Sequence, residues 1–588
     1  MMSVSCSWCG YGNRPASRYC GDCGRSLTFT AVCAACAAAN PPGARFCDAC
    51  GAGMAGAQAG AALTGPAPQT AVALTGGAPQ LVGTAPVPAL AGHGVTNGQH
   101  VVHAAPSQSS GLPAAALPAP PAGGVARLSN AVTRRLAGTG LLTAASAALA
   151  TVVILSLLLR LASLGGTPSN VTADEADNLQ TVYHIQAGTG PGFFGLDWKP
   201  SPAMSMYLVT GFLNLFGNSI FAMRLPSAVL SVVAILVFYH VVRPTVSRPA
   251  AIAATVLLST SLWYLHFSRS GWENIHIGLY GLLALLCLTM ALRGRSLLLF
   301  AASGFFAAAG LYGYISGSVI ILGLIATLPV GLFLYRKRLG RVAAGYALLL
   351  AVCSVLYYPQ MQESFDEWEH FTNRQRAVSI MGQQDGYMGD VGLPSIVASQ
   401  VVRNVKGFIL MDSGVHGVGL NARYIAPGRG ALDLGTAIIF WVGMIVSFRR
   451  LRETAIWWIM FLFMVLPIQV LSTGTPDLAR GVGSAPFFFL FVALGLDWVF
   501  KLMQAKAIQD FRPLMQAGVA ISLALIVLCN VTGYFGWVNS EASRGARQPA
   551  VENAEFAIWQ SLQMQDAEAG RFGFNVNQWH EMRQQYIR

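Results

Sequence analysis

The sequence predicts an α-helical polytopic membrane protein with a small cysteine-rich module at its N-terminus. Of its 588 residues, 54% are hydrophobic and only 11% are charged, whereas a soluble domain carries about 25% charged residues. Apolar runs long enough to cross a bilayer recur from about residue 140 to residue 535. The net charge of +12 does not indicate a nucleic-acid partner, because most Lys and Arg residues between the later runs sit in short clusters at their ends.

The N-terminal cysteines form two copies of one unit, each built from two Cys-x-x-Cys pairs. Ten residues separate the pairs within a copy, and each cysteine recurs 27 positions later. Four thiolates at this spacing suit a tetrahedral zinc ion, and so small a unit needs metal to fold. Iron in a rubredoxin-like site and disulfides remain alternatives. The predicted ligands of two structural zinc ions are Cys6, Cys9, Cys20, Cys23, Cys33, Cys36, Cys47 and Cys50. Residues 1–54 resemble the double zinc-ribbon family.

A linker separates this module from the membrane region. Residues 55–125 are rich in Ala, Pro, Gly, Thr and Val and carry almost no charge, which is typical of a flexible segment with some polyproline II character. We expect the membrane domain to occupy residues 126–540 and a short external tail to follow at 541–588. Three arginines precede the first apolar run and place the N-terminus in the cytoplasm. A reducing compartment also favours zinc over disulfides.

The membrane domain is predicted to contain about eleven spans of the plasma membrane. The predicted spans are 140–162, 226–242, 250–267, 275–292, 297–312, 318–335, 342–358, 431–448, 455–472, 484–500 and 515–535. Every basic cluster at a span end then falls on one side, which leaves the C-terminus outside. We interpret the short apolar segment 203–217 as a helix at the outer interface, and residues 360–428 as a long polar loop.

Polar residues that suit catalysis converge on the outer face in this threading. The cluster Asp174-Glu175-Ala176-Asp177 follows the first span by about ten residues, and carboxylates at the mouth of a membrane helix indicate function by default. A positioned carboxylate can take a proton from an acceptor hydroxyl, while Lys and Arg can neutralise a leaving phosphate. Cations and a further carboxylate predicted on the same face are Lys199, Arg269, Glu273 and Arg480.

Simpler interpretations of the same residues stay open at this point. Asp174 is also suited to cap a helix, and Lys199 to extend its ammonium from the interface. Arg269 and Glu273 have the spacing of an ion pair along one helical face. Arg224 is placed to anchor a turn before Pro226.

Several motifs together resemble the GT-C glycosyltransferases, and among them the protein O-mannosyltransferase and aminoarabinose transferase family. The resemblance covers about residues 140–540 and rests on the order and spacing of the motifs. They are Thr172-Ala173-Asp174-Glu175-Ala176, Lys199-Pro200-Ser201-Pro202, Arg224-Leu225-Pro226, His266-Phe267-Ser268-Arg269 and the segment from Arg480 to Pro486. The sequence departs from the family at Trp198, where the aminoarabinose transferases carry an acidic residue. This difference leaves open whether the site binds a catalytic metal.

The resemblance implies roles for individual residues. Asp174 is the implied catalytic carboxylate, supported by Glu175, and Lys199, Arg269 and Arg480 are implied contacts of the donor phosphate. Asp177 and Glu273 are candidate substrate contacts.

The implied activity is transfer of a sugar from a polyprenyl-phosphate donor to an acceptor on the external face of the plasma membrane. The sequence does not name the acceptor. We expect the zinc ribbons to bind a cytoplasmic protein partner and expect no nucleic-acid partner. The alternatives are a multi-span transporter and a zinc-ribbon membrane scaffold with an inactive transferase domain.

Overall fold

The computed structural model describes most of the helical part of the chain and four short strands near the N-terminus. Contacts between Cα atoms divide the chain into two units, Met1–Ala137 and Gly138–Arg588. Within the second unit the described residues are 140–168, 171–197, 201–294, 296–381, 392–409, 423–426, 428–473 and 475–543.

The first unit contains two antiparallel strand pairs that repeat at the spacing of the cysteines. The strands are β1 (Val4–Ser5), β2 (Gly12–Asn13), β3 (Ala31–Val32) and β4 (Ala39–Asn40). Val4 pairs with Asn13, and 27 positions later Ala31 pairs with Asn40. In each copy the two strands flank the first Cys-x-x-Cys pair in sequence, and the repeat predicted from the cysteines extends to the strand pairing. All eight predicted zinc ligands lie outside the described residues.

The described part of the second unit is helical, as predicted. Its first half contains α2 (Gly140–Leu161), α3 (Ala173–Gln186), α4 (Met204–Phe216), α5 (Ile220–Val242), α6 (Arg248–Thr260), α7 (Leu262–Phe267), α8 (Asn274–Gly294), α9 (Leu297–Gly313), η1 (Ile315–Gly317), α10 (Ser318–Ala326) and α11 (Leu328–Leu334). Its second half contains η2 (Arg336–Arg338), α12 (Leu339–Asp366), α13 (Trp368–Val378), α15 (Leu393–Ile409), α16 (Leu434–Arg449), α17 (Leu451–Val465), η3 (Leu466–Val470), α18 (Leu478–Gly481), η4 (Val482–Ser484), α19 (Ala485–Leu502), η5 (Lys506–Phe511) and α20 (Arg512–Val538).

Each predicted span coincides with one helix or with consecutive helices. Seven helical runs among the described residues are long and apolar enough to cross a membrane, and four shorter apolar helices accompany them. The predicted class, a polytopic helical membrane protein, is therefore confirmed. The segment 203–217, interpreted as an interfacial helix, forms α4 and packs against α3 and α5.

The segment predicted as a long polar loop is partly helical, so that prediction was wrong in part. α12 continues to Asp366, and α13 and α15 follow it. On α15 the buried positions recur every four residues at Ile396, Gln400, Asn404 and Phe408. Two of these four are polar, and their amides donate to the carbonyls of Ser472 and Gln469. A hydropathy pattern misses such a helix, because hydrogen bonds replace part of its apolar contact.

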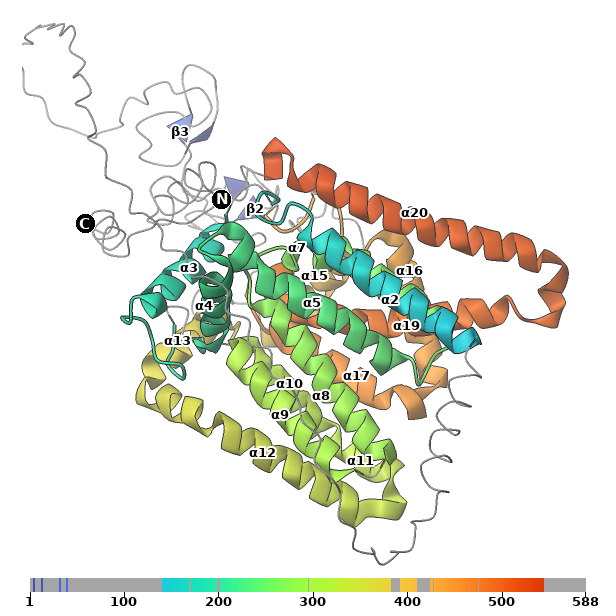
Figure 1. Cartoon of the computed structure of the whole chain (residues 1–588), viewed down its shortest axis with the longest axis horizontal. Coiled ribbons are helices and arrows are strands. Elements are labelled where there is room, and N and C mark those ends of the chain that lie inside the picture. The colour runs from blue at the N-terminus through green and yellow to red at the C-terminus, as the bar shows by residue number, and fades with distance from the viewer. Residues whose placement is uncertain are drawn as a thin grey trace, which may run out of the picture. The chain divides into compact units, whose positions relative to one another are not determined.

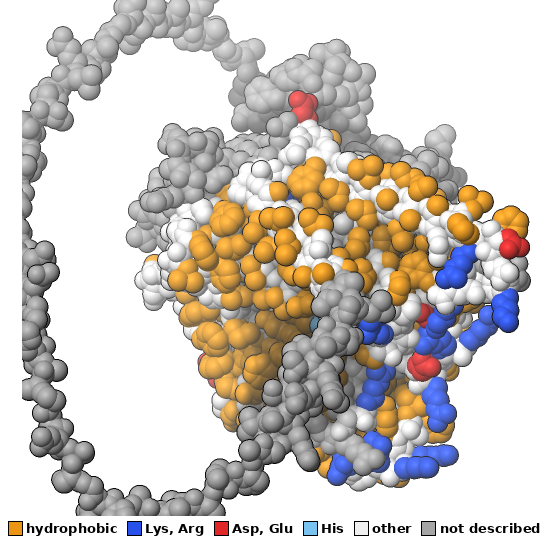
Figure 2. Space-filling view, turned by 45° about the vertical axis from the view of Figure 1, so that its right-hand side comes forward, with side chains coloured by type: hydrophobic (Ala, Val, Ile, Leu, Met, Phe, Trp, Pro, Cys, Tyr) orange, Lys and Arg blue, Asp and Glu red, His pale blue; other side chains and the backbone are white. Residues whose placement is uncertain are grey.

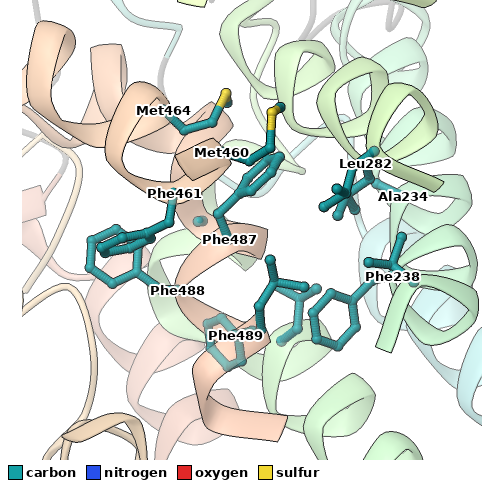
Figure 3. Close-up of a cluster of buried hydrophobic side chains, with 14 of the residues drawn as sticks. Ala234, Phe238, Leu282, Met460, Phe461, Met464, Phe487, Phe488 and Phe489 are labelled. Atoms are coloured by element: carbon teal, nitrogen blue, oxygen red, sulfur yellow. The ribbon is translucent and has the colours of Figure 1, made fainter. Parts of the chain in front are cut away.

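The core of the bundle is formed around α19. Side chains of four helices converge there (Figure 3). They are Met460 and Phe461 of α17, Phe487 of α19, Leu282 of α8 and Phe238 of α5.

Two glycines let α16 and α19 approach closely. A Cβ atom at Gly443 would lie 1.7 Å from the Phe491 carbonyl oxygen, and one at Gly495 would lie 2.2 Å from that of Ile439. Small residues serve this purpose in membrane helix pairs. By contrast α20 runs along the edge of the bundle (Figure 1), with 6% of its apolar window buried.

The two ends of the bundle differ in charge. Figure 2 shows a broad hydrophobic side, with Lys and Arg gathered toward one end. The predicted inner ends of three helices meet at the buried Asp497, which accepts from Ser247 N, Arg450 Nη1 and Lys501 Nζ. Basic residues at span ends that the hydropathy-based span assignment puts on one side of the membrane are thus brought together in space. At the other end lie α3, α4 and α13 (Figure 1).

Candidate functional site

The acidic cluster opens helix α3 as a capping box. Thr172 is the N-cap; its Oγ1 accepts from Glu175 N at 3.2 Å, and Glu175 Oε2 accepts from Thr172 N at 3.0 Å. This reciprocal pair satisfies two backbone donors at the start of the helix. The alternative in which Asp174 caps the helix is therefore wrong: Asp174 stands in the first turn, where a negative charge is favoured by the helix dipole.

Glu175 is buried and bound to Arg224. Its Oε1 accepts from Arg224 Nε at 3.0 Å and from Gly271 N at 2.8 Å, and the two side chains are 2% and 0% exposed. Arg224 Nη1 also donates to the carbonyls of Leu164 and Pro168. Burial opposes ionisation, but the charge of Arg224 and the hydrogen bonds hold the pKa of Glu175 below its ordinary value. Arg224 lies inside α5, so the interpretation that it anchors a turn was wrong.

Arg269 holds the connection between α2 and α3. Its side chain is fully buried. Its two terminal nitrogens each donate to two backbone carbonyls, at 2.7–2.8 Å, from Leu159, Arg160, Ala162 and Thr167. With these donors engaged, the geometry favours an anchoring role for Arg269 over the phosphate contact implied by the family resemblance.

Asp177 and Glu273 are also buried, at 8% and 3% exposure. Asn178 Nδ2 donates to Glu273 Oε2 at 2.7 Å and to the Gly271 carbonyl at 3.1 Å. These bonds join α3 to the start of α8. Direct contact of either carboxylate with substrate stays a prediction.

Asp174 differs from these residues because it reaches the surface. Its side chain is 25% exposed and forms an ion pair with Arg423, whose Nη1 lies 3.6 Å from Asp174 Oδ2. The next residue, Tyr424, is buried, with its ring centroid 5.9 Å from that of Trp272. Burial raises the pKa of Tyr424, and the carboxylates of Asp174 and Asp477 raise it further. Tyr424 therefore interacts electrostatically with both carboxylates.

Asp477 is bound to Arg480. The Asp477 carboxylate caps α18 by accepting from Ala479 N and Arg480 N at 2.9 Å, and it lies 3.1 Å from Arg480 Nε. Arg480 Nη1 donates to the Thr473 carbonyl at 2.8 Å. Asp174, at the start of α3, and Asp477, the partner of Arg480 far along the chain, thus both interact electrostatically with Tyr424.

Arg480 lines a cavity of about 390 Å³. Most of the lining is apolar or aromatic, and Arg480 is the one charged side chain among the described residues that form it. Lys199 lies outside the described residues, but Pro202 of the same segment lies on the cavity wall. No group of metal-ligating side chains occurs in the described part of the chain.

Sequence analysis did not identify Arg423 and Tyr424. Both fall at the end of the segment that was treated as a polar loop, just before the span that begins at α16. An arginine followed by an aromatic residue at a predicted outer interface was the one available signal, and such pairs are too common there to single out.

Comparison with known families gives two matches. Residues 200–360 match the dolichyl-phosphate-mannose-protein mannosyltransferase family. Residues 6–51 match the double zinc ribbon. The two predicted resemblances are therefore confirmed, and the second match supports structural zinc in the N-terminal unit. The mannosyltransferase match includes Arg224, Arg269 and Glu273; it begins just after Lys199, so Asp174 and Lys199 both lie outside it. No curated protein sequence matches the chain.

Solved structures of two kinds are similar to the chain at low identity. The oligosaccharyltransferase AglB of Archaeoglobus fulgidus, in complex with an inhibitory peptide and a dolichol-phosphate, is 14% identical with a TM-score of 0.44, covering 68% of this chain and 56% of that one. ArnT of Cupriavidus metallidurans bound to undecaprenyl phosphate is 14% identical with a TM-score of 0.42, covering 74% and 78%. The chain thus spans little more than half of the archaeal enzyme.

Proposed function

We propose that this protein is an integral membrane glycosyltransferase that moves a sugar from a polyprenyl-phosphate donor to an acceptor hydroxyl. The observation that carries the proposal is the apolar cavity with Arg480 on its wall, where Asp477 forms an ion pair with that arginine. An amphipathic lipid with one anionic group fits such a lining, because isoprenoid units prefer apolar surface and phosphate prefers a guanidinium.

Arg480 is suited to bind the donor phosphate. Nε and Nη1 hold its guanidinium against Asp477 and Thr473, and Nη2 has no hydrogen bond within the described residues. A fixed arginine stabilises developing charge without having to reorganise. We place Lys199 in the same role, because its segment reaches the cavity wall at Pro202.

Asp174 is suited to act as general base. Glu175 is buried against Arg224, whereas Asp174 is accessible and oriented by Arg423. In the proposed step Asp174 takes the proton of the acceptor hydroxyl as its oxygen bonds to the anomeric carbon. The bond from that carbon to the phosphate oxygen breaks, and the polyprenyl phosphate leaves with the electron pair. Attack from the face opposite the phosphate would invert the anomeric centre.

The topology is part of the proposal. Because the basic ends of α5, α16 and α19 meet at Asp497, away from α3, we place that end in the cytoplasm and Asp174 outside the plasma membrane. The eight N-terminal cysteines would bind two zinc ions in the cytoplasm and offer a docking module to a protein partner. The transporter alternative has less support, because the buried Arg160, Arg224 and Arg269 all donate to backbone carbonyls.

The test is transfer from a panel of radiolabelled polyprenyl-phosphate sugars by the purified protein. Asp174→Asn is compared with Asp366→Asn, which changes an exposed carboxylate at the end of α12. Transfer by the wild type and by Asp366→Asn but not by Asp174→Asn would support the proposal. Transfer by Asp174→Asn at the wild-type rate would remove Asp174 from the mechanism. Absence of donor binding to the wild type would overturn the function.

A further inference from the structure

Gln375 on the cavity wall and Gln360 near it have buried amide atoms without a hydrogen-bond partner among the described residues. Gln375 of α13 lines the cavity, and its Oε1 is buried without a hydrogen bond among the described residues. Gln360 of α12 is fully buried, and both its Oε1 and Nε2 lack a partner there. It lies one helical turn beyond Tyr357, which also lines the cavity. Since buried amides in proteins are nearly always hydrogen-bonded, unpaired ones gathered beside a cavity point to a polar ligand.

Backbone bonds place Gln375 near the proposed phosphate contact. Gln375 precedes Val378 by three residues, and the Val378 carbonyl accepts from Thr473 N at 2.7 Å. The Thr473 carbonyl in turn accepts from Arg480 Nη1 at 2.8 Å. A group bonded directly to a phosphate held by Arg480 would therefore lie within reach of the α13 wall.

The lining also bears on the charge of that group. A cationic amino sugar in an apolar cavity requires a carboxylate partner, because an unpaired buried charge is unfavourable. No Asp or Glu is among the described residues that line the cavity. Asp477, the carboxylate nearest to Arg480 along the chain, is already paired with that arginine. Apart from Arg480, the polar side chains of the wall are the Gln375 amide and the hydroxyls of serines and tyrosines, which match sugar hydroxyls.

We propose that the wall formed by α12 and α13, through Gln375, is the sugar subsite of the donor and that it selects an uncharged sugar. This inference rests on the proposed function. Gln375 Oε1 accepts a hydrogen bond from a sugar hydroxyl. The phosphate is bound separately, by Arg480.

The test is equilibrium binding of three short-chain lipids to the full-length protein in nanodiscs. The lipids are bare polyprenyl phosphate, its hexosyl form and its amino-sugar form. The variants are Gln375→Leu, which keeps the volume and removes the amide, and Gln375→Glu, which adds a carboxylate. Gln362→Leu is the matched control, because Gln362 is an exposed glutamine of α12.

We expect the wild type and Gln362→Leu to bind the hexosyl lipid about tenfold more tightly than the bare phosphate, the size expected for an added hydrogen bond. Gln375→Leu is expected to remove that difference while binding bare phosphate as before. Gln375→Glu is expected to raise relative affinity for the amino-sugar form, and it serves alone if the leucine variant does not fold. An unchanged hexosyl preference in both Gln375 variants, or wild-type preference for the amino sugar, would overturn the inference. Absence of binding of any lipid to the wild type would overturn the donor site itself.

Discussion

The buried pair of Glu175 and Arg224 gives the sharpest prediction about how the site is held. Arg224→Met removes the cation but keeps an unbranched side chain of similar length. It leaves the Glu175 carboxylate, at 2% exposure, with hydrogen bonds only from backbone N–H groups and the Thr172 hydroxyl. The carbonyls of Leu164 and Pro168 also lose their donor.

The magnitude follows from burial. Breaking a buried ion pair by removing one partner costs about 3–5 kcal/mol, because the other charge stays in a medium of low dielectric. The ion pair of Asp174 and Arg423 provides the matched comparison, since it joins the same helix α3 to an arginine at 25% and 37% exposure. Breaking an exposed pair costs about 0–1 kcal/mol. We therefore expect Arg224→Met to be several kcal/mol less stable than Arg423→Met.

The assay is unfolding of purified protein by titration with a denaturing detergent, followed by tryptophan fluorescence. The double variant Arg224→Met/Glu175→Leu is expected to recover much of the loss, because it removes both charges together. Equal stability of Arg224→Met and Arg423→Met would refute the reasoning. A double variant no more stable than Arg224→Met would show that the carbonyls of the α2–α3 connection, and not the carboxylate, are what Arg224 serves.

Further predictions concern the general base Asp174, the phosphate contact Arg480, the loss of stability at acidic pH and the zinc content. Asp174→Asn should lower transfer by about 100-fold or more while binding bare polyprenyl phosphate as the wild type does; weakened binding would contradict a role as base. Arg480→Gln should weaken that binding about tenfold, through loss of a charge-assisted hydrogen bond, and unchanged affinity would remove Arg480 from the donor site. The pKa of Glu175 is depressed in the folded state, so its stabilisation is present above the unfolded value of about 4.3 and is lost as pH falls toward the folded one. In Glu175→Gln, the unfolding midpoint should therefore depend less on pH in this acidic range. An unchanged pH dependence in this variant would contradict the stabilising role of the Glu175 carboxylate. Elemental analysis should find two zinc ions per chain; one or none would contradict the paired sites.

The sequence by itself determined the class of fold and the two resemblances. Length and polarity of apolar runs decide whether a segment can leave water, and this property is local, so each predicted span coincides with a helix. The cysteine repeat is equally local, and its offset of 27 residues reappears in the strand pairs. The capping box at Thr172 and Glu175 was also within reach, because its two residues are three positions apart.

Only the tertiary structure decided which polar residues are accessible and which hold the backbone. Asp174 and Glu175 are neighbours in sequence, yet one is paired at the surface with Arg423 and the other is buried against Arg224. Arg269 and Arg480 look alike in sequence, yet one binds four carbonyls and the other lines a cavity. The partners that make these differences lie tens to hundreds of residues away along the chain. Burial and hydrogen bonding are properties of the assembled bundle, and no local pattern encodes them.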